Sequence, residues 1–285
     1  MRVIIVALDG LDYYLAVKWK LRDILQKQYH RFKISERYYH EKEKVPYSPK
    51  IWSSFLTGLP PDQHNVRSWW EYHPLLEKIR HFPIIRHVPN KRRVLWKLGI
   101  RRRIVKVKSS TIVDDFDESC VVWFPGYNDS TELHERLSKA FYKGLKEYER
   151  EIWRVHRERS ERTFKMLTTK WKLFMTYFDL ADILGHIYLP KRLYELKIAY
   201  LRLNKLVYRM KREIDRSIDV DENYVFLIVS DHGMREDGQH SDYAFYSLNF
   251  ENPKIVIDDF TEFRELIKRL SMGESLHNLM KKEYR

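Results

Sequence analysis

A short apolar run that ends in metal-binding residue types constrains this chain more than any other feature. Residues 224–229 read Y-V-F-L-I-V, and Ser230, Asp231, His232 and Gly233 follow. A β-branched and aromatic run of this length predicts a buried strand. Open α/β sheets place their chemistry at the carboxyl ends of such strands. His240 adds a second imidazole after a polar loop, so the stretch indicates a metal site, although a turn with merely exposed histidines is the alternative.

Further apolar runs alternate with amphipathic segments along the whole chain. We expect strands at 3–8, 104–107, 119–124, 173–178, 224–229, 243–248 and 254–257, with an edge strand near 32–38. We expect helices at 12–28, 48–56, 94–98, 191–217 and 261–270, and one or two helices within 131–169. This alternation predicts an α/β fold, a three-layer sandwich with a mostly parallel central sheet. No repeat or linker divides the chain, so we expect one domain over 1–285, with an inserted roof segment at roughly 64–118.

The composition favours anionic partners. The chain has 285 residues and a formal net charge of +13, which suits phosphate esters, nucleotides, nucleic acid or an anionic membrane surface. No apolar run is long enough to cross a membrane. The single cysteine, Cys120, excludes an internal disulfide and predicts a cytoplasmic protein.

Residues 64–103 combine aromatic side chains with two basic clusters. Trp69 and Trp70 precede the clusters at 91–93 and 101–103. Such a segment could bind nucleic acid by stacking and phosphate contact. We favour the simpler interpretation, a roof over a site with packed tryptophans and solvated arginines.

Two more strand ends carry candidate metal ligands. Asp9 follows the first apolar run and precedes Gly10, which lets the backbone approach a ligand closely. Asp182 and His186 follow the run at 173–178, and their spacing places both on one face of a helix. Taken alone, this pair could be an ordinary helical salt bridge. We interpret Asp12 as a helix N-cap.

Ser48-Pro49 has the form of a helix start, with serine at the N-cap and proline at the first helical position. A hydroxyl in that place faces the free N–H groups of the helix, which can cradle a phosphoryl group. The alternative is a serine that only caps. His134 and His156 lie on the amphipathic segment at 131–169, and we interpret both as surface or helix-packing residues.

These motifs together resemble the alkaline phosphatase superfamily, most closely its type I phosphodiesterase/nucleotide pyrophosphatase branch. The motifs are A-L-D-G, P-Y-S-P-K-I-W-S-S-F-L-T-G-L-P-P-D-Q-H, D-I-L-G-H and S-D-H-G-M with a following histidine, in the order of that family. The resemblance implies two metal ions, usually zinc, with manganese as an alternative. By position, Ser48 matches the nucleophile, and the metal ligands match two sets: Asp9, Asp231 and His232 beside the nucleophile, and Asp182, His186 and His240 for the second metal.

The chain also departs from the family pattern. The asparagine that often follows the nucleophile by three residues is replaced by Ile51, and Lys50 is either a compensating cation or solvent-facing. Only residues 233–239 separate His232 from His240, where larger members carry an insertion. The sulfatase motif C/S-x-P-x-R is not matched at Ser48.

The resemblance implies metal-assisted hydrolysis of phosphate esters, diesters or nucleotide-type substrates, through a phosphoseryl intermediate on Ser48. Backbone N–H groups at the start of its helix are expected to bind a phosphate oxygen. One alternative is a phosphomonoesterase or phosphomutase with the same site. Another is a basic nucleic-acid or membrane-surface binding protein with a non-catalytic metal site, and nucleic acid is also a conceivable substrate. The sequence leaves the oligomeric state open.

Overall fold

The computed structural model describes residues 1–71, 103–189, 191–217 and 223–272. The expected helix at 94–98 and the basic cluster at 91–93 lie outside the described residues, as do Arg101 and Arg102. The centre of the expected roof segment lies there as well, so the domain organisation stays a prediction. Among the described helices, none combines the length and the apolar character that crossing a membrane requires.

The main sheet of the described residues has six strands in the order β2-β10-β7-β1-β6-β5. Their bounds are β1 Arg2–Leu8, β2 Gln28–Lys33, β5 Ser119–Val122, β6 Leu173–Phe178, β7 Tyr224–Ser230 and β10 Tyr243–Leu248. Strands β5, β6, β1 and β7 run parallel, whereas β10 is antiparallel to β7 and β2 to β10. The predicted mostly parallel sheet is confirmed, and its carboxyl edge collects the ends of the parallel strands.

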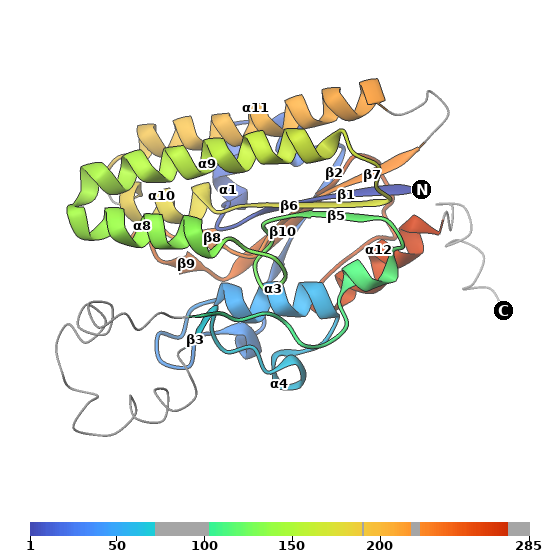
Figure 1. The fold of residues 1–285 in the computed structure, drawn as a ribbon, viewed down its shortest axis with the longest axis horizontal. Coiled ribbons are helices and arrows are strands. Elements are labelled where there is room, and N and C mark those ends of the chain that lie inside the picture. The colour runs from blue at the N-terminus through green and yellow to red at the C-terminus, as the bar shows by residue number, and fades with distance from the viewer. Residues whose placement is uncertain (72–102, 190, 218–222, 273–285) are drawn as a thin grey trace.

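Two hydrophobic cores lie on opposite faces of this sheet, because the side chains of a strand alternate between its faces. Ile4, Val6 and Leu8 of β1 face one core, covered by α1 Tyr13–Lys18, α2 Arg22–Leu25, α8 Thr131–Lys143, α9 Leu145–Leu167, α10 Leu180–Tyr188 and α11 Leu193–Ser217. Residues 3, 5 and 7 face the other, which we call the lower core. It is covered by α3 Ser48–Thr57, α12 Phe263–Ser271 and the 3₁₀ turns η1 Glu36–Tyr38, η2 Ile112–Asp115 and η3 Phe260–Glu262. Figure 1 shows the resulting three layers.

Smaller elements complete the described chain. Helix α4, Pro61–His64, follows α3. Strand β3, Trp70–Glu71, pairs with β4, Arg103–Ile104, so the strand expected at 104–107 is only partly present. Strand β8, Gly233–Met234, pairs with β9, His240–Ser241, in a hairpin at the carboxyl edge of the sheet.

The long helix expected at 12–28 is wrong. The chain forms α1 and α2 instead, and positive φ angles at Lys20 and Gln26, of 53° and 60°, turn it between the elements. Asp12 is the N-cap of α1 as predicted, since its Oδ1 accepts a hydrogen bond from the Leu15 N–H at 2.9 Å. The edge strand β2 begins at residue 28 and not at 32.

The strand expected at 254–257 is absent, whereas the helices expected within 131–169 are present. Residues 254–257 form no strand, although Ile255 and Ile257 are buried in the lower core. The segment 131–169 forms two helices that meet at Gly144, which is one of the two expected arrangements. Phe141 and Leu145, apolar residues beside this junction, do not face a core and are 61% and 56% exposed.

Candidate metal centre

The backbone of Asp9 and Gly10, at the carboxyl end of β1, forms hydrogen bonds with residues that follow β6 and β7. The Asp182 N–H donates to the Asp9 carbonyl at 3.0 Å, and the Gly10 N–H donates to Asp231 Oδ1 at 3.2 Å. Gly10 has a φ of +65°, and a Cβ there would lie 2.6 Å from the Asp182 Cα. Glycine is therefore required at this position, because any side chain would push α10 away from the tip of β1.

The short loop between His232 and His240 is the β8–β9 hairpin. Met234 pairs with His240 across it, and the imidazole rings of His232 and His240 stack with their centroids 3.7 Å apart. Gly233 fits tightly, since a Cβ there would lie 2.3 Å from Asp12 Oδ2. The shortness of the loop thus holds two imidazoles in one place.

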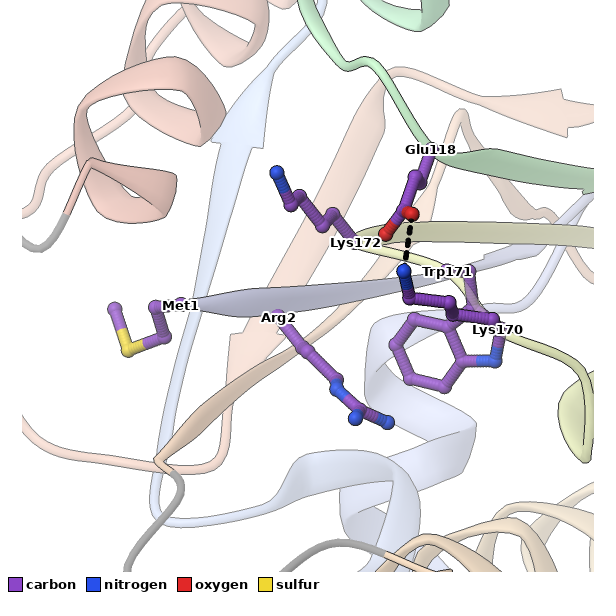
Figure 2. A pocket seen from close by; sticks show the side chains of 6 residues that line it. All are labelled: Met1, Arg2, Glu118, Lys170, Trp171 and Lys172. Atoms are coloured by element: carbon purple, nitrogen blue, oxygen red, sulfur yellow. Dashed lines mark ion pairs between the residues drawn. The ribbon is translucent and has the colours of Figure 1, made fainter.

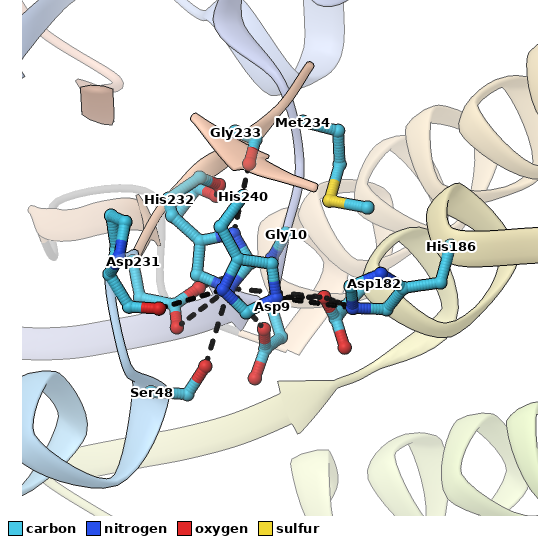
Figure 3. A network of polar contacts seen from close by, with 12 residues as sticks. Asp9, Gly10, Ser48, Asp182, His186, Asp231, His232, Gly233, Met234 and His240 are labelled. Atoms are coloured by element: carbon cyan, nitrogen blue, oxygen red, sulfur yellow. Dashed lines mark hydrogen bonds and ion pairs between the residues drawn. The ribbon is translucent and has the colours of Figure 1, made fainter. Parts of the chain in front are cut away.

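All seven residues predicted for the site converge at the carboxyl edge of the sheet (Figure 3). His232 Nε2 lies near three oxygens: Asp9 Oδ1 at 3.4 Å, Asp231 Oδ2 at 3.5 Å and Ser48 Oγ at 3.3 Å. Asp182 Oδ1 lies near two imidazoles: His186 Nε2 at 3.2 Å and His240 Nε2 at 3.5 Å. His232 Nε2 is 3.8 Å from Asp182 Oδ1, so the two groups adjoin.

The three histidines share one orientation. Each places its Nδ1 against a backbone carbonyl: His232 on Gly233 at 3.0 Å, His186 on Gly238 at 2.7 Å and His240 on Pro46 at 2.7 Å. A carbonyl only accepts hydrogen bonds, so Nδ1 carries the proton and a neutral ring turns the Nε2 lone pair to the centre. Histidines that bind metals are usually fixed in this way.

The unpaired oxygens at the centre fit divalent cations. Asp9 Oδ1, Asp182 Oδ1 and Asp231 Oδ2 are buried without a hydrogen-bond donor in the described structure. Buried carboxylate oxygens are costly unless a cation or donor compensates them. Two sets of ligand atoms, from Asp9, Asp231 and His232 and from Asp182, His232 and His240, each lie within 4.8 Å of one another. Carboxylates with imidazoles can hold divalent metal ions.

Burial and crowded charge set the protonation of this centre. Burial raises the pKa of Asp9, and the neighbouring charges of Asp231 and Asp182 raise it further. Burial lowers the pKa of His232, which keeps that ring neutral. Burial also opposes charge on His186, but the adjacent Asp182 carboxylate raises its pKa to about 9. Cation binding at this centre must therefore displace protons.

The comparisons with known proteins agree with the motifs. The profile of the type I phosphodiesterase/nucleotide pyrophosphatase family matches residues 3–282. The chain belongs to this family. The predicted superfamily and branch are thereby confirmed. No curated protein sequence is similar enough to this chain to count as a match.

Three solved structures are similar to this phosphodiesterase-family chain. Murine ectonucleotide pyrophosphatase/phosphodiesterase 5 has 15% identity and a TM-score of 0.44 over 82% of this chain and 57% of its own. The human counterpart has 14% identity and a TM-score of 0.41 with the same coverage. A 2-O GAG sulfatase has 9% identity and a TM-score of 0.54 over 95% of this chain and 70% of its own. The chain spans little more than half the length of the first two. The family match and the sulfatase structure confirm the predicted alkaline-phosphatase-like fold.

Ser48 differs from the expected cap. Tyr47 is the N-cap of α3, and Ser48 is its first helical residue. The N–H groups of Lys50 and Ile51 both donate to the Tyr47 carbonyl, and Pro49 has none. Of residues 48–51, only Ser48 keeps an N–H for a ligand, so the expected cradle of several N–H groups is wrong.

The departures from the family pattern have structural reasons. Ile51, which stands in place of the asparagine of the family pattern, is fully buried and packs in the lower core. Lys50 does not face solvent freely, because its Nζ donates to the Tyr39 carbonyl at 2.7 Å. Neither side chain is available as the phosphate ligand that other family members place here.

Two residues that bind Asp9 were not predicted. Trp52 Nε1 donates to Asp9 Oδ2 at 3.3 Å, and the Tyr177 hydroxyl donates to the same oxygen. Trp52 lies within the motif around Ser48, and Tyr177 lies five residues before Asp182, near the end of an apolar run. In both, the only available signal was a ring with a polar tip. They fix Asp9 so that Oδ1 faces the centre.

A buried cation supports this arrangement from behind. Arg159 is 1% exposed, lies over the Tyr177 ring at 5.5 Å, and pairs with Asp129 at 3.3 Å and Asp179 at 3.6 Å. His134 binds Asp129 at 2.5 Å, which confirms a packing role for that histidine.

A pocket of about 340 Å³ opens at the opposite, amino edge of the sheet, lined by Met1, Arg2, Glu118, Lys170, Trp171 and Lys172 (Figure 2). Glu118 neutralises Lys170 across it at 2.6 Å. It lies away from the ends of the strands that carry the candidate ligands, and we assign no chemistry to it.

Proposed function

We propose that this chain hydrolyses phosphate esters, namely diesters or nucleotide-type substrates, through a phosphoseryl intermediate on Ser48. One observation carries the proposal. The Ser48 Oγ lies 3.3 Å from His232 Nε2, beside buried carboxylate oxygens that have no donor. A hydroxyl at a centre suited to cations is the arrangement that activates a serine for attack on phosphorus.

The proposed cofactors are two divalent ions, zinc or manganese. Asp9, Asp231 and His232 would hold one ion beside Ser48, and Asp182, His186 and His240 would hold the other. When bound, such ions lower the pKa of hydroxyls and neutralise phosphoryl charge.

Four residues of the chain have separate roles in the proposed reaction. Ser48 Oγ forms the new bond to phosphorus as the bond to the leaving oxygen breaks, and water then cleaves the phosphoserine and restores the hydroxyl. The Ser48 N–H binds a non-bridging oxygen. Trp52 and Tyr177 hold Asp9 in place.

Replacing the nucleophile tests the proposal. We expect Ser48→Ala to lower turnover of bis-p-nitrophenyl phosphate by about 10³-fold or more, because no other hydroxyl takes its place. Metal content and thermal unfolding should stay unchanged. The matched control is Ser53→Ala on the same helix, a fully buried hydroxyl without a partner, which should keep full activity. Undiminished turnover by Ser48→Ala overturns the assignment.

The substrate class has its own test. We expect bis-p-nitrophenyl phosphate to be hydrolysed faster than mono-p-nitrophenyl phosphate when zinc or manganese is added. The reverse preference would indicate a phosphomonoesterase or phosphomutase with the same residues. Cleavage of single-stranded DNA would extend the substrate class to nucleic acid.

We also propose a cytoplasmic location, which rests on the single cysteine. Cys120 is buried and free. Fractionation of cells that produce the tagged chain tests this, and recovery outside the cytoplasm contradicts it.

A further inference from the structure

The corner between α8 and α9 exposes large apolar side chains that no core explains. Residues 139–146 read K-A-F-Y-K-G-L-K. Phe141, Tyr142 and Leu145 are 61%, 67% and 56% exposed. Three large apolar residues gathered at one exposed corner are a feature of binding surfaces more than of ordinary protein surface.

The corner is convex and its aromatic cluster is preformed. The Phe141 ring packs edge-on against Tyr142 and Tyr148, with centroids 5.8 and 5.3 Å apart. A Cβ built on Gly144 would meet nothing within 4 Å. In Figure 1 the corner projects from the end of the helical layer. It is a protrusion and not a groove.

The charged residues within the tip are all basic, and the nearest acids in sequence, Glu135 and Glu147, face Lys139 and Arg150. Lys139, Lys143 and Lys146 surround the tip, and residues 139–146 contain no acid. Lys139 lies 3.8 Å from Glu135. Lys143 and Lys146 form no ion pair with any described residue, so both ammonium groups are available to an anionic partner.

The corner lies at the same end of the molecule as the metal centre. Strand β1 runs from the N-terminus toward the side of Figure 1 on which the corner projects. Phe141 contacts Tyr148 of α9, and α9 packs beside α10, the helix that carries Asp182.

We propose that the α8–α9 corner, residues 139–146, docks the protein on an anionic phospholipid surface. Phe141, Tyr142 and Leu145 enter the boundary between headgroups and acyl chains, where aromatic rings are favoured. Lys143 and Lys146 contact the lipid phosphates. This docking goes beyond the proposed hydrolysis and does not depend on it.

The shape and charge of the corner argue against a second copy as its occupant. A stable protein interface buries about 800 Å² on each partner, which a convex tip of three side chains does not provide. A two-fold contact would also bring the lysines of both copies together, and like charges repel. An anionic surface matches both the convex shape and the positive charge.

Vesicle cosedimentation of the metal-loaded chain tests the docking. We expect binding to vesicles of phosphatidylcholine with phosphatidylserine, weak binding to phosphatidylcholine alone, and weaker binding at high salt. Lys143→Glu with Leu145→Ser should weaken binding by about 100-fold, because it reverses one charge and removes one buried apolar group. The matched control is Lys254→Glu with Val256→Ser, in which the two changed residues have the same spacing. Val256 is 59% exposed and lies over the lower core, away from the corner. This control should bind vesicles as wild type does.

Two readouts separate docking from other effects. The corner variant should unfold thermally at the wild-type temperature, which shows an intact fold. Ser48→Ala should bind vesicles as wild type, so failure of the proposed hydrolysis leaves this result standing.

Four outcomes overturn the proposal. The first is no binding to phosphatidylserine vesicles, and the second is equal binding by the corner variant and wild type. The third is a change of oligomeric state caused by the corner variant in light scattering, which assigns the corner to a second copy. The fourth is binding of a single-stranded oligonucleotide through these residues without vesicle binding, which assigns it to nucleic acid.

Discussion

At the scale of single residues, the two oxygens of Asp9 have different tasks. Oδ2 accepts hydrogen bonds from Trp52 and Tyr177, whereas Oδ1 has no donor and faces His232 Nε2 at 3.4 Å. Hydrogen bonds behind a metal ligand fix its orientation and basicity. The metal affinity of the candidate site should therefore depend on Trp52 and Tyr177, which hold Asp9 from behind.

Tyr177→Phe tests this dependence. We expect metal affinity to fall by about 10- to 100-fold, because Asp9 loses a donor while the buried ring is kept. Chelator competition measures the affinity. Tyr246→Phe is the matched control, since its buried hydroxyl donates to the Ile255 carbonyl at 3.0 Å in the lower core. Equal affinities for the two variants would contradict the role of Tyr177.

His156 links stability to pH away from the centre. It packs against Phe178, and burial lowers its pKa from 6.5 to about 4. The unfolded chain therefore binds the proton more readily, so its contribution to stability is complete above pH 6.5 and is lost as the pH falls toward 4. We expect wild type to lose about 1–2 kcal/mol more than His156→Leu between pH 7 and pH 5.

Urea unfolding at the two pH values, with a chelator present, measures this difference. Parallel losses of stability in wild type and His156→Leu would show that His156 is not held neutral in the folded protein.

The candidate ligand residues carry a local signal in the sequence, whereas the residues that support them do not. Asp231, His232 and Asp182 are polar residues that lie shortly after apolar runs. The change from apolar to polar residues is a signal that can be recognised in the local sequence. Tyr177 and Trp52 lie inside apolar runs, where their bulk indicates core and hides the polar tip. Only the register of neighbouring strands brings Tyr177, opposite Ala7, to the Asp9 carboxylate.

At the scale of elements, the tip of β1 and the β8–β9 hairpin set the spacing of the ligands. Gly10 contacts the backbone of Asp182 at the start of α10. The hairpin brings His240 beside His232. Because both contacts involve backbone, small side-chain additions should shift whole elements.

Gly10→Ala tests this sensitivity against Gly58→Ala. The two glycines have φ angles of +65° and +70°, but a Cβ at Gly58 would meet ordinary contacts at 3.4 Å while one at Gly10 would overlap Asp182 at 2.6 Å. We expect Gly58→Ala to cost about 1 kcal/mol. Gly10→Ala should cost more and should also reduce metal content. Equal stability and equal metal content in the two variants would contradict the tight contact.

Elements with a strong local signal were predicted, and those defined by distant partners were not. Strands β1, β6 and β7 are runs of consecutive buried residues, so their composition reveals them. Strand β2 reads Q-Y-H-R-F-K and is held as an edge by β10, without an alternating pattern of its own. Residues 254–257 carry the alternation of a strand but find no neighbouring strand.

At the scale of the whole molecule, the residues that stabilise the fold and the residues of the candidate site lie in different places. One hydrophobic core on each face of the sheet holds the strands in place. The polar residues of the candidate site gather at one edge, where the parallel strands end. The fold class follows from the alternation of strands and helices. The meeting of Asp9, Ser48 and the hairpin follows from the strand order, which no local pattern contains.

We infer that six side chains form two adjacent metal sites beside Ser48. Anomalous diffraction from crystals of the zinc- or manganese-loaded protein tests it most directly. We expect two peaks about 4 Å apart, one bound by Asp9, Asp231 and His232 and the other by Asp182, His186 and His240. A single peak, or peaks away from this edge of the sheet, would contradict it.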